Sequence, residues 1–191
     1  ESLYGCTFEN CASTFSGGAL YIYCPDIEGT DTDHTLRISG CNFTKCRSNV
    51  EGGAICSGQV RIGDEEQKTE GDNDFQITNC YFTECESAKG GALYFQDGTK
   101  TGDEETRISY CHFTNCYASS GEGYAMSCRS YKLTISLMTF KEHKRSESKS
   151  SDSIVYIEMN EAEVAPEIDG LEFEDNSGVS GLTLIASNSV A

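Results

Sequence analysis

Residues 77–95, ITNCYFTECESAKGGALYF, contain the two motifs that decide the fold. The first motif is Cys-x-Phe-x-x-Cys, and the second is Gly-Gly-Ala followed by an aliphatic residue. Four copies of the pair occur in the same order, the last with an altered second motif: Cys6, Phe8, Cys11 and 17–20; Cys41, Phe43, Cys46 and 52–55; Cys80, Phe82, Cys85 and 90–93; Cys111, Phe113, Cys116 and 123–126. Internal repetition at this scale predicts a solenoid of stacked units.

Two weaker copies follow the four regular ones. Phe140 precedes the apolar segment 154–157, and Phe173 precedes the segment 181–185. The segment from each Phe to its glycines is nearly constant in length, whereas the segment after them varies. This pattern is typical of a solenoid whose insertions lie on one side.

Short apolar runs with a period of two residues fill each repeat, as at Leu36 and Ile38 and again at Cys41 and Phe43. This period is typical of strands, and no window has a helical period. Three short strands per repeat predict an all-β fold, a single-stranded parallel β-helix of about six rungs. Its hand is expected to be right, because parallel crossover connections are. Phe8, Phe43, Phe82 and Phe113 are expected to form one interior stack, beside a column of Leu20, Ile55, Leu93 and Met126.

The length of 191 residues indicates one domain over 1–191. Its cysteine-rich rungs are regular over 1–136 and degenerate over 137–191. A rod of this kind has two open ends with unpaired strand edges. We therefore expect a fragment or subunit of a longer assembly, stacking end to end with other copies or with neighbouring solenoid segments.

Composition limits the setting and the partners. A formal charge of −17 argues against nucleic acid as a partner, and no apolar run is long enough for a membrane span. Eleven cysteines are many for a reducing compartment, and Asn42 begins the glycosylation sequon Asn-Phe-Thr. These features favour an extracellular or cell-surface location, with chance occurrence as the alternative reading of the sequon.

The paired motifs resemble the polymorphic outer membrane protein (Pmp) repeat family of chlamydial and protist surface proteins. That family is marked by Phe-x-x-Asn and Gly-Gly-Ala-Ile. Residues 173–176 match the first motif literally and residues 52–55 match the second, while the four regular copies carry Cys in place of Asn. The resemblance implies a β-helical surface protein that acts in adhesion.

Stacking in register would place the cysteines in two columns: Cys6, Cys41, Cys80 and Cys111, and Cys11, Cys46, Cys85 and Cys116. Neighbours at the strand spacing of about 4.8 Å could form disulfides or remain buried thiols, and the spacing suits zinc poorly. Cys56 lies at a position expected to point outward. It is therefore the predicted exposed thiol.

Carboxylates cluster in the loops that follow the rungs and are expected to project from one side of the rod. A weak calcium site is one interpretation, and a solvated acidic face is the other. No further cofactor is expected. The candidate ligands are Asp31, Asp33, Asp64, Glu65, Glu66, Asp103, Glu104 and Glu105.

The residues that recur have structural roles, and the histidines, His34, His112 and His143, suggest no catalytic triad. We therefore expect a non-catalytic surface protein, either adhesin-like with a host-surface or glycan ligand, or a structural subunit of a surface layer or filament. The alternative is a polysaccharide-active lyase or hydrolase on a β-helix scaffold, which would need a positioned carboxylate pair or a calcium ion.

Overall fold

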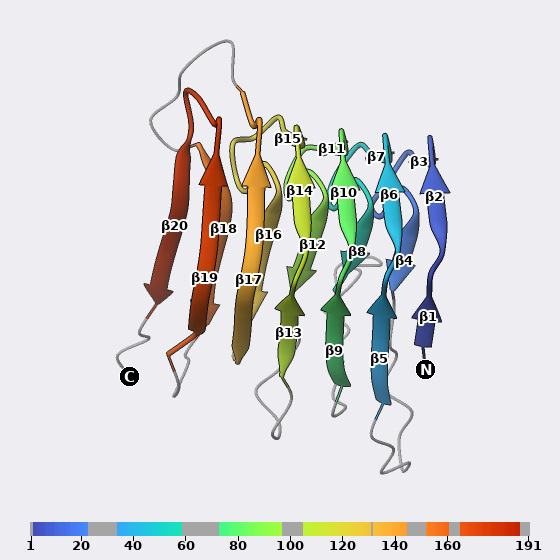
Figure 1. Cartoon of the computed structure of the whole chain (residues 1–191), viewed down its shortest axis with the longest axis horizontal. Coiled ribbons are helices and arrows are strands. Elements are labelled where there is room, and N and C mark those ends of the chain that lie inside the picture. Colours follow the sequence, from blue (N-terminus) through green and yellow to red (C-terminus); the bar gives the residue numbers. More distant parts are fainter. Residues whose placement is uncertain are drawn as a thin grey trace, which may run out of the picture.

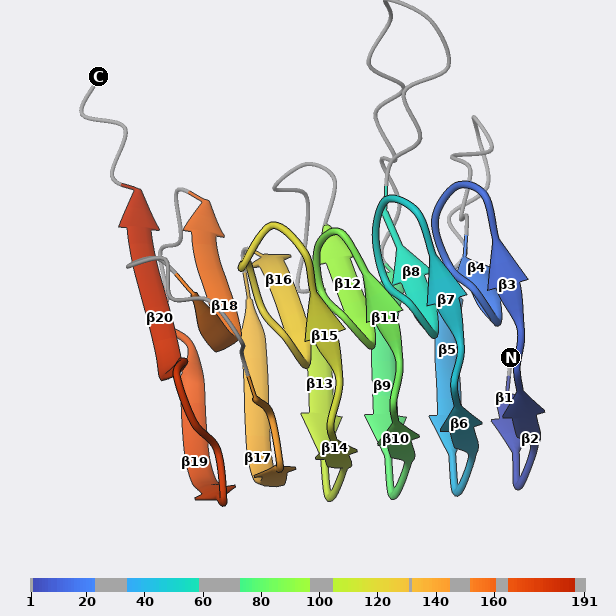
Figure 2. The same cartoon turned by 90° about the horizontal axis from the view of Figure 1, so that it is seen from above.

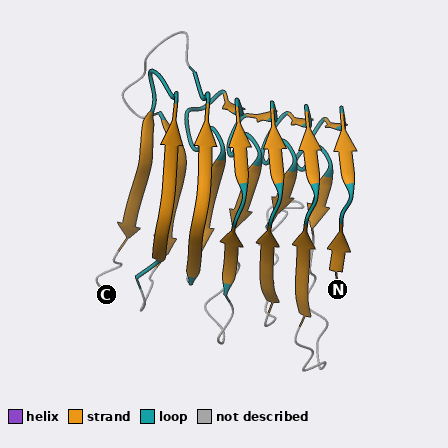
Figure 3. Cartoon of the chain, in the orientation of Figure 1, coloured by secondary structure: helices purple, strands orange, loops and turns teal. Residues whose placement is uncertain are grey.

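The computed structural model describes residues 2–22, 34–58, 73–96, 105–130, 132–144, 152–160 and 165–187. All regular secondary structure in these ranges is β-strand (Figure 3), which confirms the all-β prediction. Within the same ranges, no helix offers the length and apolar character that a membrane crossing requires.

The strands form three parallel sheets, which we call A, B and C (Figures 1 and 2). Sheet A contains β1 (Ser2–Tyr4), β2 (Thr7–Glu9), β5 (His34–Ser39), β6 (Asn42–Thr44), β9 (Asn73–Thr78), β10 (Tyr81–Thr83), β13 (Thr106–Ser109), β14 (His112–Thr114), β17 (Leu133–Lys141) and β19 (Glu167–Glu174). Sheet B contains β3 (Ala12–Ser13), β7 (Arg47–Ser48), β11 (Glu86–Ser87) and β15 (Tyr117–Ala118). Sheet C contains β4 (Leu20–Ile22), β8 (Ile55–Ser57), β12 (Leu93–Gln96), β16 (Met126–Ser130), β18 (Ser153–Asn160) and β20 (Ser180–Ser187).

Each sequence repeat adds strands to the sheets beside those of the repeat before it. Phe82 in β10, for example, pairs with Phe43 in β6 on one side and with Phe113 in β14 on the other. Figure 1 shows the consequence, with β1 and β2 at one end of the molecule and β19 and β20 at the other. Equivalent residues of successive repeats therefore stack in columns.

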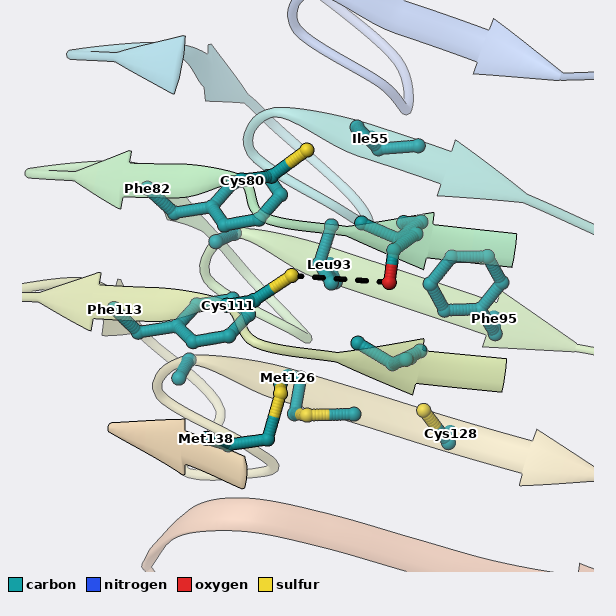
Figure 4. Close-up of a cluster of buried hydrophobic side chains, with 14 of the residues drawn as sticks. Ile55, Cys80, Phe82, Leu93, Phe95, Cys111, Phe113, Met126, Cys128 and Met138 are labelled. Atoms are coloured by element: carbon teal, nitrogen blue, oxygen red, sulfur yellow. Dashed lines mark hydrogen bonds between the residues drawn. The ribbon is translucent and has the colours of Figure 1, made fainter. Parts of the chain in front are cut away.

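The phenylalanine column is the centre of the core. Its rings stack nearly parallel from Phe8 to Phe173, with centroid separations of 4.7 to 5.2 Å. The rings of Phe43, Phe82, Phe113 and Phe140 are fully buried. Leu20, Ile55, Leu93 and Met126 form the expected column in sheet C, which Val155 and Leu182 extend. Both predicted columns are confirmed, and Figure 4 shows Phe82 and Phe113 beside Leu93.

The two glycines of the second motif are needed for different reasons. The first, as at Gly52, has a φ of 61°, a left-handed conformation that strains residues with a side chain. The second, as at Gly53, has no room for a side chain, because a Cβ there would overlap the carbonyl oxygen of Gly91 in the next repeat. The predicted turn role accounts for the first glycine, and close stacking of the repeats accounts for the second.

The strands of sheet A become longer after the fourth repeat. In the first four repeats, a left-handed residue such as Tyr110 separates two short strands, β13 and β14 in this case. In β17 and β19 the two segments merge into one strand, although Leu137 and Gly170 keep the left-handed conformation at the same place. The degenerate repeats therefore keep the register of the regular ones while their motifs change.

Candidate functional site

The eight predicted column cysteines lie at the corners of the repeats. Each comes directly after a left-handed residue, as Cys80 follows Asn79 and Cys85 follows Glu84. The turn directs the cysteine inward, and six of the eight are buried, while Cys6 and Cys11 of the first repeat are partly exposed. The predicted columns are therefore present in the structure.

The column cysteines are free thiols in this structure. Each thiol of the second to fourth repeats lies within hydrogen-bonding distance of two backbone carbonyls, one two residues earlier and one in the preceding repeat, between which its single proton is shared. The Sγ of Cys116, for example, lies 3.6 Å from the carbonyl oxygens of both Thr114 and Phe82. The thiols thus add a second interaction at carbonyls such as that of Thr114, which also accepts the backbone N–H of Glu84. Disulfide bonds between column neighbours remain a prediction.

Several of the column cysteines have a raised pKa, which keeps them as unreactive thiols at neutral pH. Burial raises the pKa of Cys41 and of Cys111, and a hydrogen bond with Cys85 raises that of Cys46. Only Cys80 shifts the other way, because a hydrogen bond with Cys111 lowers its pKa. Thiols act as nucleophiles only as thiolates, so the columns are suited to packing rather than to reaction.

The last two repeats fill the same corner with other side chains. The register continues the second cysteine column into His143 and Asn176. The Asn176 amide donates to the carbonyl of Phe140 at 2.9 Å, as Cys116 donates to the carbonyl of Phe82. Its Oδ1 also accepts the backbone N–H of His143 at 2.8 Å. Asparagine and cysteine are therefore equivalent corner donors here, and the Phe-x-x-Asn match at 173–176 was the sequence signal.

His143 is a buried residue that the sequence did not identify. Its neighbours in the sequence are polar and basic, yet its side chain is fully buried beside Phe140. Burial lowers the pKa of His143 to about 4, although a hydrogen bond with Asn176 opposes this shift. No described residue is a hydrogen-bond partner of its Nε2. The imidazole is therefore neutral at physiological pH.

The prediction that Cys56 is exposed is wrong. Cys56 does lie on the outer face of sheet C, paired with Tyr21 and Tyr94, but only 3% of its surface is accessible. Residues of the turns between sheets B and C, including Glu51, share a cavity with it and cover that face. Burial, and secondarily the charge of Glu51, raises the pKa of Cys56 to about 12. Strand alternation predicted the direction of the side chain but not its cover.

Charged side chains also lie along this covered face of sheet C. Lys89 forms an ion pair with Glu122 at 3.0 Å, and Arg129 forms one with Glu158 at 2.9 Å. The hydroxyl of Tyr94 donates to Gln96 at 3.0 Å, and burial raises the pKa of Tyr94 above its usual range. The sequence offered no signal for this network, because its members come from turns and strands of different repeats.

Seven of the eight candidate calcium ligands lie outside the described residues; the exception is Glu105. Burial opposes ionisation of Glu105, but hydrogen bonds from Arg107 and Thr134 lower its pKa overall. Its carboxylate is thus already engaged within the protein. No group of three or more His, Cys, Asp or Glu side chains among the described residues is placed to hold a metal ion.

Two of the remaining predicted positions, Asn42 and His112, lie on the outer surface of sheet A. Asn42 is exposed on β6, as expected from alternation, and its glycosylation stays a prediction. The ring of His112 stacks on that of Tyr81 with centroids 4.8 Å apart. His34 begins β5. This surface therefore presents aromatic and polar groups.

No protein-family model, no curated protein and no solved structure matches this chain.

Proposed function

We propose that the chain is a right-handed parallel β-helix of six rungs that serves as a non-catalytic structural subunit of a surface layer or filament. The observation that carries this proposal is that the first and last repeats present the same columns at opposite ends. Leu3, Phe8, Leu20 and Ile22 are the first members of their columns, and Ile168, Phe173, Leu182 and Leu184 are the last. Either end would continue the other in register.

Both ends leave core side chains partly uncovered. Phe8 is half-buried, whereas Phe43 directly behind it is fully buried. At the other end, Phe173 is 39% exposed and Leu184 is 49% exposed. The outer edges of the end strands also carry backbone groups that a parallel strand would pair. We propose that the C-terminal end of one copy covers the N-terminal end of the next, a head-to-tail contact that generates filaments.

The non-catalytic part of the proposal is supported by the roles of the repeated residues. The phenylalanines fill the core, the glycines form the turns, and the cysteines pack at the corners and donate to backbone carbonyls there. We place the protein outside the cell on its cysteine content and on the exposed sequon at Asn42. Mass spectrometry of non-reduced protein from its native source would detect both a glycan at Asn42 and any disulfide between column neighbours.

Light scattering over a range of protein concentrations, with electron microscopy, tests the end-to-end contact. We expect rods that lengthen with concentration, and shortening when Phe8→Asp is introduced at the exposed end. Phe173→Asp at the other end should have the same effect. Mixing the two variants should yield dimers, because each retains one intact and complementary end. A strictly monomeric wild type at millimolar concentration contradicts the proposal.

Adhesion is a second candidate, favoured by an aromatic patch on the outer surface of sheet A. Tyr81 is 51% exposed and Tyr110 is 52% exposed, and Leu137 is exposed beside Tyr110 in the next repeat. An exposed patch of this kind suits a glycan or host-surface ligand. Loss of cell or glycan binding in Tyr81→Ser, with wild-type association, would favour adhesion over assembly.

The alternative of a polysaccharide-active enzyme has its own test. Acidic and neutral polysaccharides are incubated with the protein, with and without calcium, and product formation is measured. We expect no cleavage. Measurable turnover that Glu158→Gln or Arg129→Ala abolishes would replace the structural proposal with the enzymatic one, because these residues form the ion pair on the covered face of sheet C.

A further inference from the structure

The outer face of sheet C differs between its two halves. Over the later repeats, the pairs Lys89–Glu122 and Arg129–Glu158 place a cation beside each carboxylate. Over the first three repeats, the same face contains a cavity of about 540 Å³. This volume lies within the range of ligand pockets in proteins.

Three aromatic rings line the cavity: those of Phe15, Tyr21 and Tyr94. Tyr94 is buried, Tyr21 is 43% exposed, and Phe15 is 76% exposed at the rim. The Phe15 segment is nevertheless held in place, because its carbonyl accepts the N–H groups of both Asn49 and Val50 at 3.1 Å. The backbone that carries the Phe15 ring is therefore tied to the next repeat.

Glu51 is the one charged side chain among the described residues that line the cavity. The negative charge of Glu51 acts on two other residues that line the cavity. Together with burial, it raises the pKa of both Cys56 and Tyr94. Those two groups are therefore neutral at pH 7, and Glu51 gives the cavity a negative charge. Among the described residues Glu51 has no ion pair, unlike Glu122 and Glu158 farther along the same face.

We propose that this cavity binds an alkylammonium group, with Glu51 as the counterion and the rings of Phe15, Tyr21 and Tyr94 as its walls. A carboxylate beside several aromatic faces is the arrangement that recognises methylated and primary ammonium ions, because the ring faces carry partial negative charge. The chain's net charge of −17 also raises the local concentration of cations. The cavity opens on the side of the molecule, so this inference does not depend on end-to-end association.

The source of the ammonium group is either a small amine or a lysine side chain of another protein. Aromatic and methyl resonances are followed by NMR in 150 mM salt while tetramethylammonium chloride is added. The peptide acetyl-Gly-Lys-Gly-amide is titrated in parallel. Saturable shifts of the Tyr21 and Tyr94 rings with either probe support the proposal. Tighter binding of tetramethylammonium indicates a small amine, and tighter binding of the peptide indicates a lysine side chain.

Matched variants distinguish binding in this cavity from the general attraction of cations to an acidic protein. Glu51→Gln should weaken binding about tenfold or more, whereas Glu86→Gln, at a half-exposed carboxylate outside the cavity, should leave it unchanged. Tyr21→Leu should weaken binding several-fold, and Tyr21→Phe should not, because the ring face remains. Circular dichroism checks that each variant keeps its strand content.

Two results would overturn the proposal. One is wild-type affinity for tetramethylammonium in Glu51→Gln. The other is a neutral probe, either tert-butanol or glucose, that shifts the same ring resonances with equal or greater affinity. The tert-butanol result would indicate a purely apolar cavity, and the glucose result would indicate a saccharide site.

Discussion

The four cysteine-rich repeats and the two repeats after them form the same corner with different side chains. In the first region a thiol donates to the corner carbonyls, as Cys116 does to Phe82. In the second region, the Asn176 amide makes the equivalent bond to Phe140 while Met138 and Leu171 continue the other column. The comparison teaches that the corner takes an inward side chain after a left-handed residue, and that in the second column this side chain can be a donor to the carbonyl of the preceding repeat. Cysteine is only one way to supply it.

The largest expected effect tests the shared phenylalanine column. Phe82→Ala should lower the free energy of unfolding by about 3–5 kcal/mol, because the fully buried ring leaves a cavity between two stacked rings. Phe173→Ala should cost about 1 kcal/mol, since that ring is partly exposed at the end of the stack. Urea unfolding of both variants measures the difference. Equal losses would mean that the two regions do not share one continuous core.

The next effect concerns pH and is confined to the second region. The pKa of His143 is about 4 in the folded protein against an ordinary value of 6.5, because burial disfavours the charged ring. The unfolded chain therefore binds the proton first, and stability is lost as pH falls from about 6.5 toward 4. Lowering the pH from 7 to 5 should cost about 2 kcal/mol from this group.

His143→Gln is the control for the pH effect. Other groups titrate over the same range, so the relevant quantity is the difference between the two proteins in their loss of unfolding free energy. We expect the variant to lose less stability than the wild type between pH 7 and pH 5. The same loss in both proteins would show that His143 is not buried as a neutral ring.

A smaller effect tests the equivalence of the two corner donors. Asn176→Ala should cost about 1–2 kcal/mol, because the Phe140 carbonyl and the His143 N–H both lose their partner. Asn176→Cys should cost less, since a thiol can still donate to the carbonyl as it does in the first region. Thermal unfolding of the two variants provides the comparison. A cysteine variant no more stable than the alanine variant would refute the equivalence.

The smallest expected effect comes from the ion pairs on the outer surface. Lys45 and Glu84 lie 4.0 Å apart, and both are about half exposed. Glu84→Gln should change the free energy of unfolding by less than about 0.5 kcal/mol, because water and salt screen such pairs. Glu174→Gln, which removes the pair with Lys141 in the second region, should have a similarly small effect. A loss above 1 kcal/mol in only one variant would mean that surface ion pairs stabilise one region more than the other.

The sequence by itself determined the parallel strands, the repeat boundaries and the inward columns. Phe82, Cys80 and Leu93 could be assigned to the core because alternation fixes the face of a strand, and repetition fixes which residues meet. Gly52 could be assigned to a turn for the same local reason. The weak copies at Phe140 and Phe173 were also identified, and the structure pairs both with the column.

Only the tertiary structure decided what covers each face. Cys56 points outward from its strand, yet turns of its own and neighbouring repeats cover it. His143 lies in a polar stretch of sequence, yet the stacking of Asn176 and Phe140 encloses it. The direction of a side chain depends on a few local dihedral angles, which the sequence pattern reveals. Its exposure depends on segments that are distant in sequence, and these meet only when the repeats stack.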